Sequence, residues 1–219
     1  MREVFGKRVY DQFTEVVDST HTALIVIDMQ NDFAHPDGNH AAHGRDTTRI
    51  HDIVPAIDEL VAGAREAGVL VIWIMNTCLP EGRSDSPAWL AFKSHVGSGA
   101  EYTIDGSWGH GLVAPLEPRV GEPVVQKFRS SAFVGTPLDL LLRSNGIETV
   151  VLCGCVTEGC VESTARSASF HEYHTYLAGD CVASTRPDLH DAALLVLGAR
   201  YPIRARTDYL TAWRHDDRP

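Results

Sequence analysis

The sequence predicts an α/β fold in which helices cover both faces of a doubly wound, mostly parallel sheet, giving three layers. Two observations favour this fold class. Several short runs, such as TALIVID at 22–28 and ETVVLCG at 148–154, are apolar at nearly every position, as expected for strands buried on both faces. Stretches with helical periodicity alternate with these runs, which is typical of a parallel sheet with crossover helices.

The first half of the chain contains two predicted strands and one predicted helix. The strand at 22–28 ends in an aspartate, and VLVIWIMN at 69–76 forms the second strand. Between them, apolar residues recur at helical spacing over 48–67, and Gly68 ends this helix. Residues 77–121 are rich in glycine, proline and serine and predict a long irregular region.

The second half continues the alternation. EPVVQK at 122–127 is the third predicted strand, and a short helix follows at 136–146, with Thr136 as its N-cap. The strand at 148–154 leads into a helix with the sequence CVESTARSASFHEY, and HTYLAGDCV at 174–182 is the fifth strand. The last predicted elements are a helix over PDLHDAALLVLGARY and an edge strand within YPIRARTDYL.

Composition is that of a globular protein. The 219 residues are 44% hydrophobic and 22% charged, and no repeat or linker divides them, so we expect a single domain over 1–219 with 1–20 as an N-terminal extension. A net charge of -10 without a basic stripe argues against a nucleic-acid partner. No stretch predicts a signal peptide or a membrane span, so we expect a cytoplasmic protein with no membrane partner.

Ligands of such folds bind at the carboxyl ends of the strands. Asp28, Asn76 and Lys127 occupy three of these ends, and the segment 154–160 occupies a fourth. Each has an ordinary interpretation when taken alone: Asp28 as a turn residue, Lys127 as a solvated charge, and Cys160 as a small buried side chain. Their convergence on one edge instead predicts a catalytic site.

Cysteine chemistry explains why these residue types belong together. Cys160 falls in the first turn of its predicted helix, where backbone N–H groups and the Lys127 ammonium would lower the pKa of the thiol. Asp28 would accept the thiol proton and later donate it to a leaving amine. N–H groups near the helix start would bind an oxyanion.

A metal site is not expected. Cys153, Cys155 and Cys160 lack the paired spacing of structural zinc sites, and HEYH at 171–174 is one residue short of a zincin motif. The five cysteines form no disulfide framework, which predicts free thiols.

Further pocket residues are predicted from position. The loop after Asp28 supplies four candidates: Gln30, Asn31, Phe33 and His35. His40 is an alternative to His35, and Phe33 has core packing as an alternative role. Arg129 is a candidate for binding a substrate carboxylate, with a surface ion pair as the alternative. The region 83–110 would close over the pocket with aromatic side chains, or pack in the core or between subunits.

Three segments, TALIVIDMQNDF, QKFRSSAF and GCVTEGCVESTARSA, resemble the isochorismatase-like cysteine hydrolases in order and spacing. The resemblance extends from about residue 20 to residue 210 and implies that fold. It further implies an Asp28–Lys127–Cys160 catalytic triad, a cis peptide bond at Val156–Thr157, and an oxyanion hole formed by the backbone N–H groups of Thr157 and Cys160. It also implies a homo-oligomer, a dimer or a tetramer.

Departures from the family pattern narrow the function. NTCLPEGR after the second strand lacks the Asp-x-His metal motif of nicotinamidases, so we expect no metal and no cofactor. Similarity to ureidoacrylate, N-carbamoylsarcosine and biuret amidohydrolases implies a hydrolase of non-peptide C–N bonds. It would act on a small amide or ureide through a covalent thioester or carbamoyl intermediate and release ammonia. The alternatives are a vinyl-ether hydrolase of the isochorismatase type and a non-catalytic binding protein on the same fold.

Overall fold

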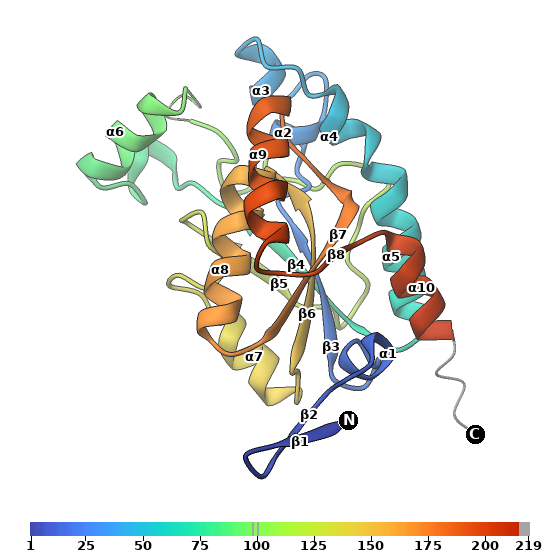
Figure 1. Cartoon of the computed structure of the whole chain (residues 1–219). Helices are drawn as coiled ribbons and strands as arrows, with labels where there is room; N and C mark the ends of the chain where they lie inside the picture. The colour runs from blue at the N-terminus through green and yellow to red at the C-terminus, as the bar shows by residue number, and fades with distance from the viewer. Residues whose placement is uncertain (98, 100, 215–219) are drawn as a thin grey trace.

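The computed structural model describes residues 1–97, 99 and 101–214. Within them, six parallel strands form one sheet in the order β5-β4-β3-β6-β7-β8 (Figure 1). The strands are β3 (Thr22–Ile27), β4 (Leu70–Asn76), β5 (Val124–Lys127), β6 (Thr149–Cys155), β7 (His174–Ala183) and β8 (Ile203–Arg204). The predicted fold class is confirmed.

Helices cover both faces of this sheet (Figure 1). One face packs against α5 (Val54–Glu66) and α10 (Arg206–Arg214), and the other against α7 (Leu138–Ser144), α8 (Glu162–Phe170) and α9 (Pro187–Gly198). Alternate residues of β3 serve the two faces: Leu24 and Val26 join the first core cluster, and Ala23, Ile25 and Ile27 join the second. Because both faces are buried, the strand reads as a continuous apolar run.

Several elements differ from the sequence-based expectation. The helix over 48–67 is divided into α4 (Thr48–Asp52) and α5, because Pro55 lacks the N–H that would continue the helical bonding. The expected edge strand within 201–210 is only the two residues of β8, and α10 follows. Tyr209, Leu210 and Trp213 recur at helical spacing and are buried.

The N-terminal residues form a separate two-stranded sheet, β1 (Arg2–Val4) and β2 (Lys7–Val9), followed by α1 (Phe13–Val16). The loop after β3 contains the short helices α2 (Asn31–Ala34) and α3 (Asn39–Ala42). The region 77–121, expected to be irregular, contains the 3-10 turn η1 (Pro80–Gly82) and the helix α6 (Pro87–His95). Within the described part of α6 only Lys93 is buried, so no apolar periodicity marked this helix in the sequence.

The strand order places a topological switch between β3 and β6. From β3 the chain winds outward through β4 and β5 on one side, and β6, β7 and β8 follow on the other. At such a point the connections diverge and leave a crevice at the carboxyl ends of the strands. The two strands approach closely there: Gly154 has a φ of 115°, and a Cβ at this position would clash with the Ile27 carbonyl oxygen.

Candidate functional site

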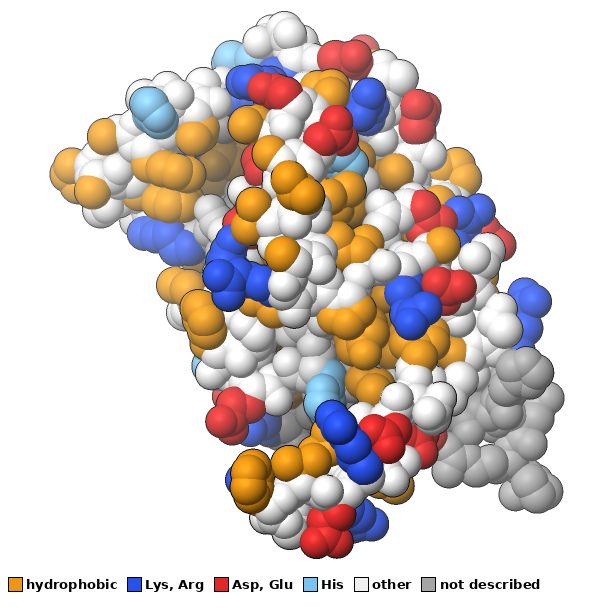
Figure 2. Space-filling model, in the orientation of Figure 1, with side chains coloured by type: hydrophobic (Ala, Val, Ile, Leu, Met, Phe, Trp, Pro, Cys, Tyr) orange, Lys and Arg blue, Asp and Glu red, His pale blue; other side chains and the backbone are white. Residues whose placement is uncertain are grey.

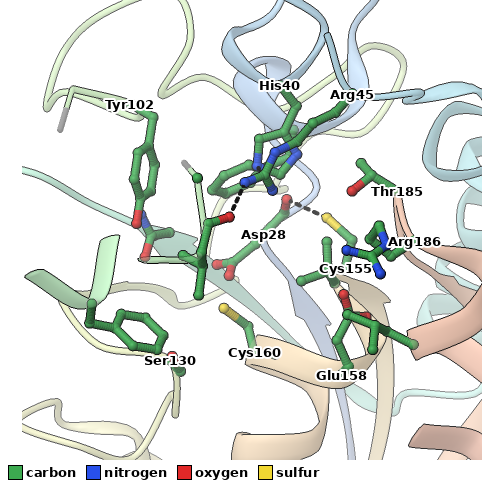
Figure 3. A pocket seen from close by; sticks show the side chains of 18 of the residues that line it. Asp28, His40, Arg45, Tyr102, Ser130, Cys155, Glu158, Cys160, Thr185 and Arg186 are labelled. Atoms are coloured by element: carbon green, nitrogen blue, oxygen red, sulfur yellow. Dashed lines mark hydrogen bonds between the residues drawn. The ribbon is translucent and has the colours of Figure 1, made fainter. Parts of the chain in front are cut away.

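Asp28, Lys127 and Cys160 meet at this crevice. Lys127 Nζ lies 2.8 Å from Asp28 Oδ2 and 3.2 Å from Cys160 Sγ. The Lys127 and Asp28 side chains are 0% and 1% exposed, respectively. Cys160 is half-buried and faces the pocket with Asp28 (Figure 3). The structure therefore brings together the three residues that the sequence singled out.

Asp28 is the first residue beyond β3 and has a φ of 53°, a left-handed conformation that is uncommon outside glycine. Two hydrogen bonds hold its backbone: its N–H donates to Ile74 O at 2.9 Å, and Cys155 Sγ donates to its carbonyl oxygen at 3.2 Å. Such conformations persist where neighbouring contacts hold them, and they occur often at functional sites. The neighbouring strands β4 and β6 thus orient the carboxylate.

Lys127 ends β5, and its ammonium has further acceptors in Asn76 Oδ1 at 3.4 Å and Arg129 O at 3.2 Å. Burial by itself lowers the pKa of this ammonium, but the adjacent Asp28 and Cys160 outweigh it and raise the pKa above the usual lysine value. The residue therefore remains a cation at neutral pH.

Burial raises the pKa of Asp28, and the Lys127 charge opposes the rise. Burial likewise raises the pKa of the Cys160 thiol to about 12, with Lys127 opposing and Asp28 adding to the increase. The expected lowering of the thiol pKa is therefore wrong for this structure, because burial outweighs the ammonium. The resting arrangement is an Asp28–Lys127 ion pair beside a neutral thiol.

The turn before Cys160 differs from expectation by one residue, and Thr157, the expected oxyanion-hole residue beside Cys160, does not line the pocket. The cis peptide bond joins Cys155 to Val156, not Val156 to Thr157. Val156 lines the pocket, and its N–H meets no acceptor in the described part of the chain. Thr157 is fully buried, and its Oγ1 lies 2.8 Å from His190 Nδ1. Motif resemblance located the turn, but the sequence does not determine which of its amides faces the pocket.

Cys160 itself lies in a π-helical turn, Thr157–Val161, that continues into α8. Turns of this kind are common at functional sites. Glu158 in the same turn also lines the pocket. Its Oε1 accepts a hydrogen bond from Ser184 Oγ at 2.8 Å, and Oε2 is buried with no donor among the described residues.

The pocket has a volume of about 770 Å³. Asp28 and Cys160 lie close together in its lining (Figure 3), and Val156 also lines it. Aromatic side chains line part of the wall: Phe33, Trp89, Phe92 and Tyr102. Polar and charged side chains from distant loops complete it: His40, Arg45, Asp46, Asn76, His95, Ser130, Glu158, Thr185 and Arg186. A small molecule with both apolar and polar groups fits such a lining.

Of the five predicted pocket residues only Phe33 lines the cavity. The Gln30 side chain instead forms hydrogen bonds of 2.8–3.0 Å with backbone groups of Asn76 and His110. Asn31 Nδ2 donates to Trp108 O at 2.8 Å. Both side chains are buried, and their polar groups are used for backbone hydrogen bonds, so the prediction that they contact substrate is wrong.

The other two predicted residues also lie outside the lining. The His35 ring packs edge-on against Trp108 at 5.1 Å. Arg129 donates to Ser84 O at 3.2 Å, and its guanidinium lies 4.9 Å from the centroid of the Trp89 ring. Arg129 thus supports a pocket aromatic rather than facing the cavity. The sequence did not indicate the pocket residues Arg45, Thr185 and Arg186, because they come from loops that only the folded chain brings to this edge.

The resemblance noted in the sequence implies that a nicotinamidase-type metal motif would lie in the segment after β4. Over the residues that the structure describes, no three His, Cys, Asp or Glu side chains come close enough to hold a metal ion. Cys78, in this segment, lies instead against Lys93. The residues present do not fit that metal site.

No helix within the described ranges has the length and apolar character needed to cross a membrane.

Comparison with known proteins identifies the family. A model described as the isochorismatase domain matches residues 22–203. The ureidoacrylate amidohydrolase RutB of Methylobacterium radiotolerans is 35% identical over an alignment of 189 residues that covers 81% of this chain and 73% of that protein.

Solved structures agree with this assignment. A cysteine hydrolase from Pseudomonas syringae pv. phaseolicola has a TM-score of 0.80 at 23% identity, covering 92% of this chain and 96% of that one, and shares the fold. The N-carbamoylsarcosine amidase from Thermoplasma acidophilum has a TM-score of 0.68 at 26% identity, covering 85% and 96%. The resemblance seen in the sequence is thereby confirmed, and the chain belongs to the isochorismatase family.

Proposed function

We propose that this protein is a cysteine-dependent amidohydrolase that cleaves an amide or ureido C–N bond of a small molecule and releases ammonia. One observation carries the proposal: Lys127 Nζ lies within 3.2 Å of both Asp28 Oδ2 and Cys160 Sγ, and Asp28 and Cys160 line a pocket. A base, a cation and a nucleophile are the groups that such a reaction requires.

In the first step, Cys160 Sγ adds to the substrate carbonyl carbon while its proton passes to Asp28. The raised pKa of Asp28 makes the carboxylate a better base than an exposed aspartate. The C–S bond forms and the carbonyl oxygen becomes an oxyanion, which the N–H groups of Val156 and Cys160 would bind. Asp28 then protonates the departing nitrogen, the C–N bond breaks, and ammonia leaves a thioester or carbamoyl enzyme.

In the second step, Asp28 removes a proton from water, and the resulting hydroxide adds to the thioester carbon. The C–S bond breaks, and sulfur leaves with the electron pair. Lys127 stabilises this sulfur through its charge at 3.2 Å, until the proton on Asp28 returns to it. No step transfers a proton to or from Lys127, and its raised pKa keeps it a cation while Asp28 takes up and releases the proton.

The relatives support this choice of reaction. The named activities of two matched proteins, a ureidoacrylate amidohydrolase and an N-carbamoylsarcosine amidase, are both hydrolyses of carbon–nitrogen bonds. We infer that the present substrate is likewise a small amide or ureide.

An ammonia-release screen over ureides, carbamoyl amino acids and aromatic amides tests the proposal, with Cys160→Ser as the control. We expect release by the wild type and a loss of at least about a thousandfold in the variant. Vinyl-ether cleavage that continues in Cys160→Ser would favour the isochorismatase-type reaction. Ligand binding without turnover of any compound would favour a binding protein.

The homo-oligomer and the cytoplasmic location are further parts of the proposal that rest on sequence. Light scattering coupled to size-exclusion chromatography would determine the oligomer, and a single-chain mass would contradict a dimer or tetramer.

A further inference from the structure

The chain has three lysines, and Lys93 repeats the arrangement found at Lys127. Lys93 Nζ lies 2.6 Å from Asp85 Oδ2 and 3.2 Å from Cys78 Sγ, and it stands 4.7 Å from the centroid of the Tyr102 ring. The Lys93 and Asp85 side chains are 1% and 2% exposed. Such burial leaves no room for a substrate, so this cluster is not a second catalytic site.

Lys93 belongs to α6, a helix that extends away from the sheet (Figure 1). In the described part of the chain, α6 has no extensive packing contact with another helix or strand. Hydrophobic side chains gather on the surface of this projecting segment (Figure 2), where Phe92 and Val96 are exposed. The burial of apolar side chains therefore does little to fix the position of α6 against the rest of the protein.

The same helix nevertheless forms part of the pocket wall. Trp89, Phe92 and His95 line the cavity, and Trp89 and Phe92 stack with ring centroids 4.6 Å apart. Because these rings stand on a weakly packed helix, their position in the wall of the pocket that contains Cys160 depends on the polar contacts that connect the helix to the body.

Three cationic side chains make these contacts. Lys93 joins α6 to Cys78 and Asp85. Arg129 lies over the Trp89 ring, and Arg45 Nη2 donates to Val96 O at 2.6 Å, just beyond the helix. Of the three, Lys93 is the most completely buried, where an ion pair is least screened by water.

We propose that Lys93 is a positioning residue for substrate recognition, which holds Trp89 and Phe92 in the wall of the pocket that contains Cys160 through its contacts with Asp85 and Cys78. The wall selects amides or ureides that carry an aromatic or similarly large apolar group. This inference rests on the proposed function and deepens it, since it assigns the apolar part of the substrate to α6.

The test compares matched large and small compounds, phenylurea with methylurea and benzamide with acetamide. The variants are Lys93→Met, Asp85→Asn and Lys93→Arg, and Lys7→Met is the matched control because Lys7 is exposed. We expect Lys93→Met to raise KM for the large compounds about tenfold and to leave kcat and both constants for the small compounds within about twofold. Lys93→Arg, which keeps the charge, should recover part of the large-compound affinity.

Two further readouts distinguish positioning from general damage. The rate at which iodoacetamide alkylates Cys160 should be unchanged in Lys93→Met, because this small reagent does not need the wall. Dissociation constants measured by calorimetry in a Cys160→Ala background should show the same tenfold loss for phenylurea or benzamide.

The inference is overturned if Lys93→Met leaves the ratio of large-compound affinity to small-compound affinity unchanged. A parallel loss of kcat and thiol reactivity, or a wild type that does not favour the large compounds, also overturns it. If Lys93→Met does not fold, the Lys93→Met/Asp85→Asn double variant carries the same comparison without an unpaired buried charge. If no compound releases ammonia, the proposed reaction fails, and the dissociation constants still decide the role of Lys93.

Discussion

Lys127 Nζ and Asp28 Oδ2 form an ion pair of 2.8 Å in which neither side chain is more than 1% exposed. The pair joins the end of β5 to the end of β3 across the intervening strand β4. It also holds a base next to the Cys160 thiol without neutralising either member of the pair. The chemistry proposed for the site depends on this relationship.

Replacing Lys127 should lower both the unfolding free energy and the catalytic activity. Lys127→Met leaves the Asp28 carboxylate buried without its cation, which costs about 3–5 kcal/mol in unfolding free energy. Urea denaturation measures this loss. The Asp28→Asn/Lys127→Met double variant should be less destabilised than Lys127→Met, because no charge is left unpaired. A double variant that is as unstable as the sum of the single ones would contradict the coupling.

The pH dependence of kcat/KM should show a fall on the acid side only. Asp28 must be ionised to accept the thiol proton, and its pKa is raised above 3.8, so kcat/KM falls as the pH drops through that raised value. At high pH, Lys127 remains protonated and the thiol pKa is about 12, so the rate should stay flat to at least about pH 10.

His40 supplies the control for this profile. Burial lowers the pKa of His40 to about 3, so this pocket histidine stays neutral across the acid limb. The midpoint should therefore be the same in His40→Gln as in the wild type. If the midpoint of the acid limb shifts in His40→Gln, the titrating group is His40 and not Asp28.

Alkylation should distinguish Cys160 from the other thiols. Cys78, Cys153, Cys155 and Cys181 are buried, and only Cys160 of the described cysteines is half-exposed in the pocket. Iodoacetamide should modify Cys160 first and faster as the pH rises toward 12. The reaction should be slower in Lys127→Met, because the Lys127 ammonium opposes the rise in the thiol pKa. Peptide mass mapping over time measures the order, and equal rates at all five sites would contradict an accessible nucleophile.

Gly154 should tolerate no side chain. Its positive φ and the Ile27 carbonyl oxygen leave no space for a Cβ at the β3–β6 switch point. Gly154→Ala should lower the unfolding free energy by at least about 2 kcal/mol. Gly146→Ala is a matched control, because Gly146 also has a positive φ but a Cβ added there would meet nothing within 4 Å. A similar loss of unfolding free energy in both variants would attribute the effect to backbone conformation alone.

The sequence predicted the parallel sheet well because strands buried on two faces, such as β3 and β6, carry their signal within a few consecutive residues. It predicted the positions of Asp28, Lys127 and Cys160 for the same reason: each lies at or just beyond a strand end, and strand ends of a parallel sheet share one edge.

Elements that depend on tertiary contacts were less predictable. Helix α6 was missed because Lys93, not an apolar residue, is its buried side chain. Burial also reversed the expected pKa shift at Cys160, since the sequence indicated the neighbouring ammonium but not the desolvation. Arg129 was a candidate for binding a substrate carboxylate or for a surface ion pair, but its position over Trp89 follows from the path of a loop that local patterns do not encode.

The most direct test is rapid-quench mass spectrometry of the enzyme during turnover of an ammonia-releasing substrate. We predict an acyl or carbamoyl adduct on the peptide that contains Cys160, formed as fast as ammonia appears and absent in Cys160→Ala. Undiminished ammonia release by Cys160→Ala, or an adduct on a different residue, would contradict a sulfur nucleophile at this site.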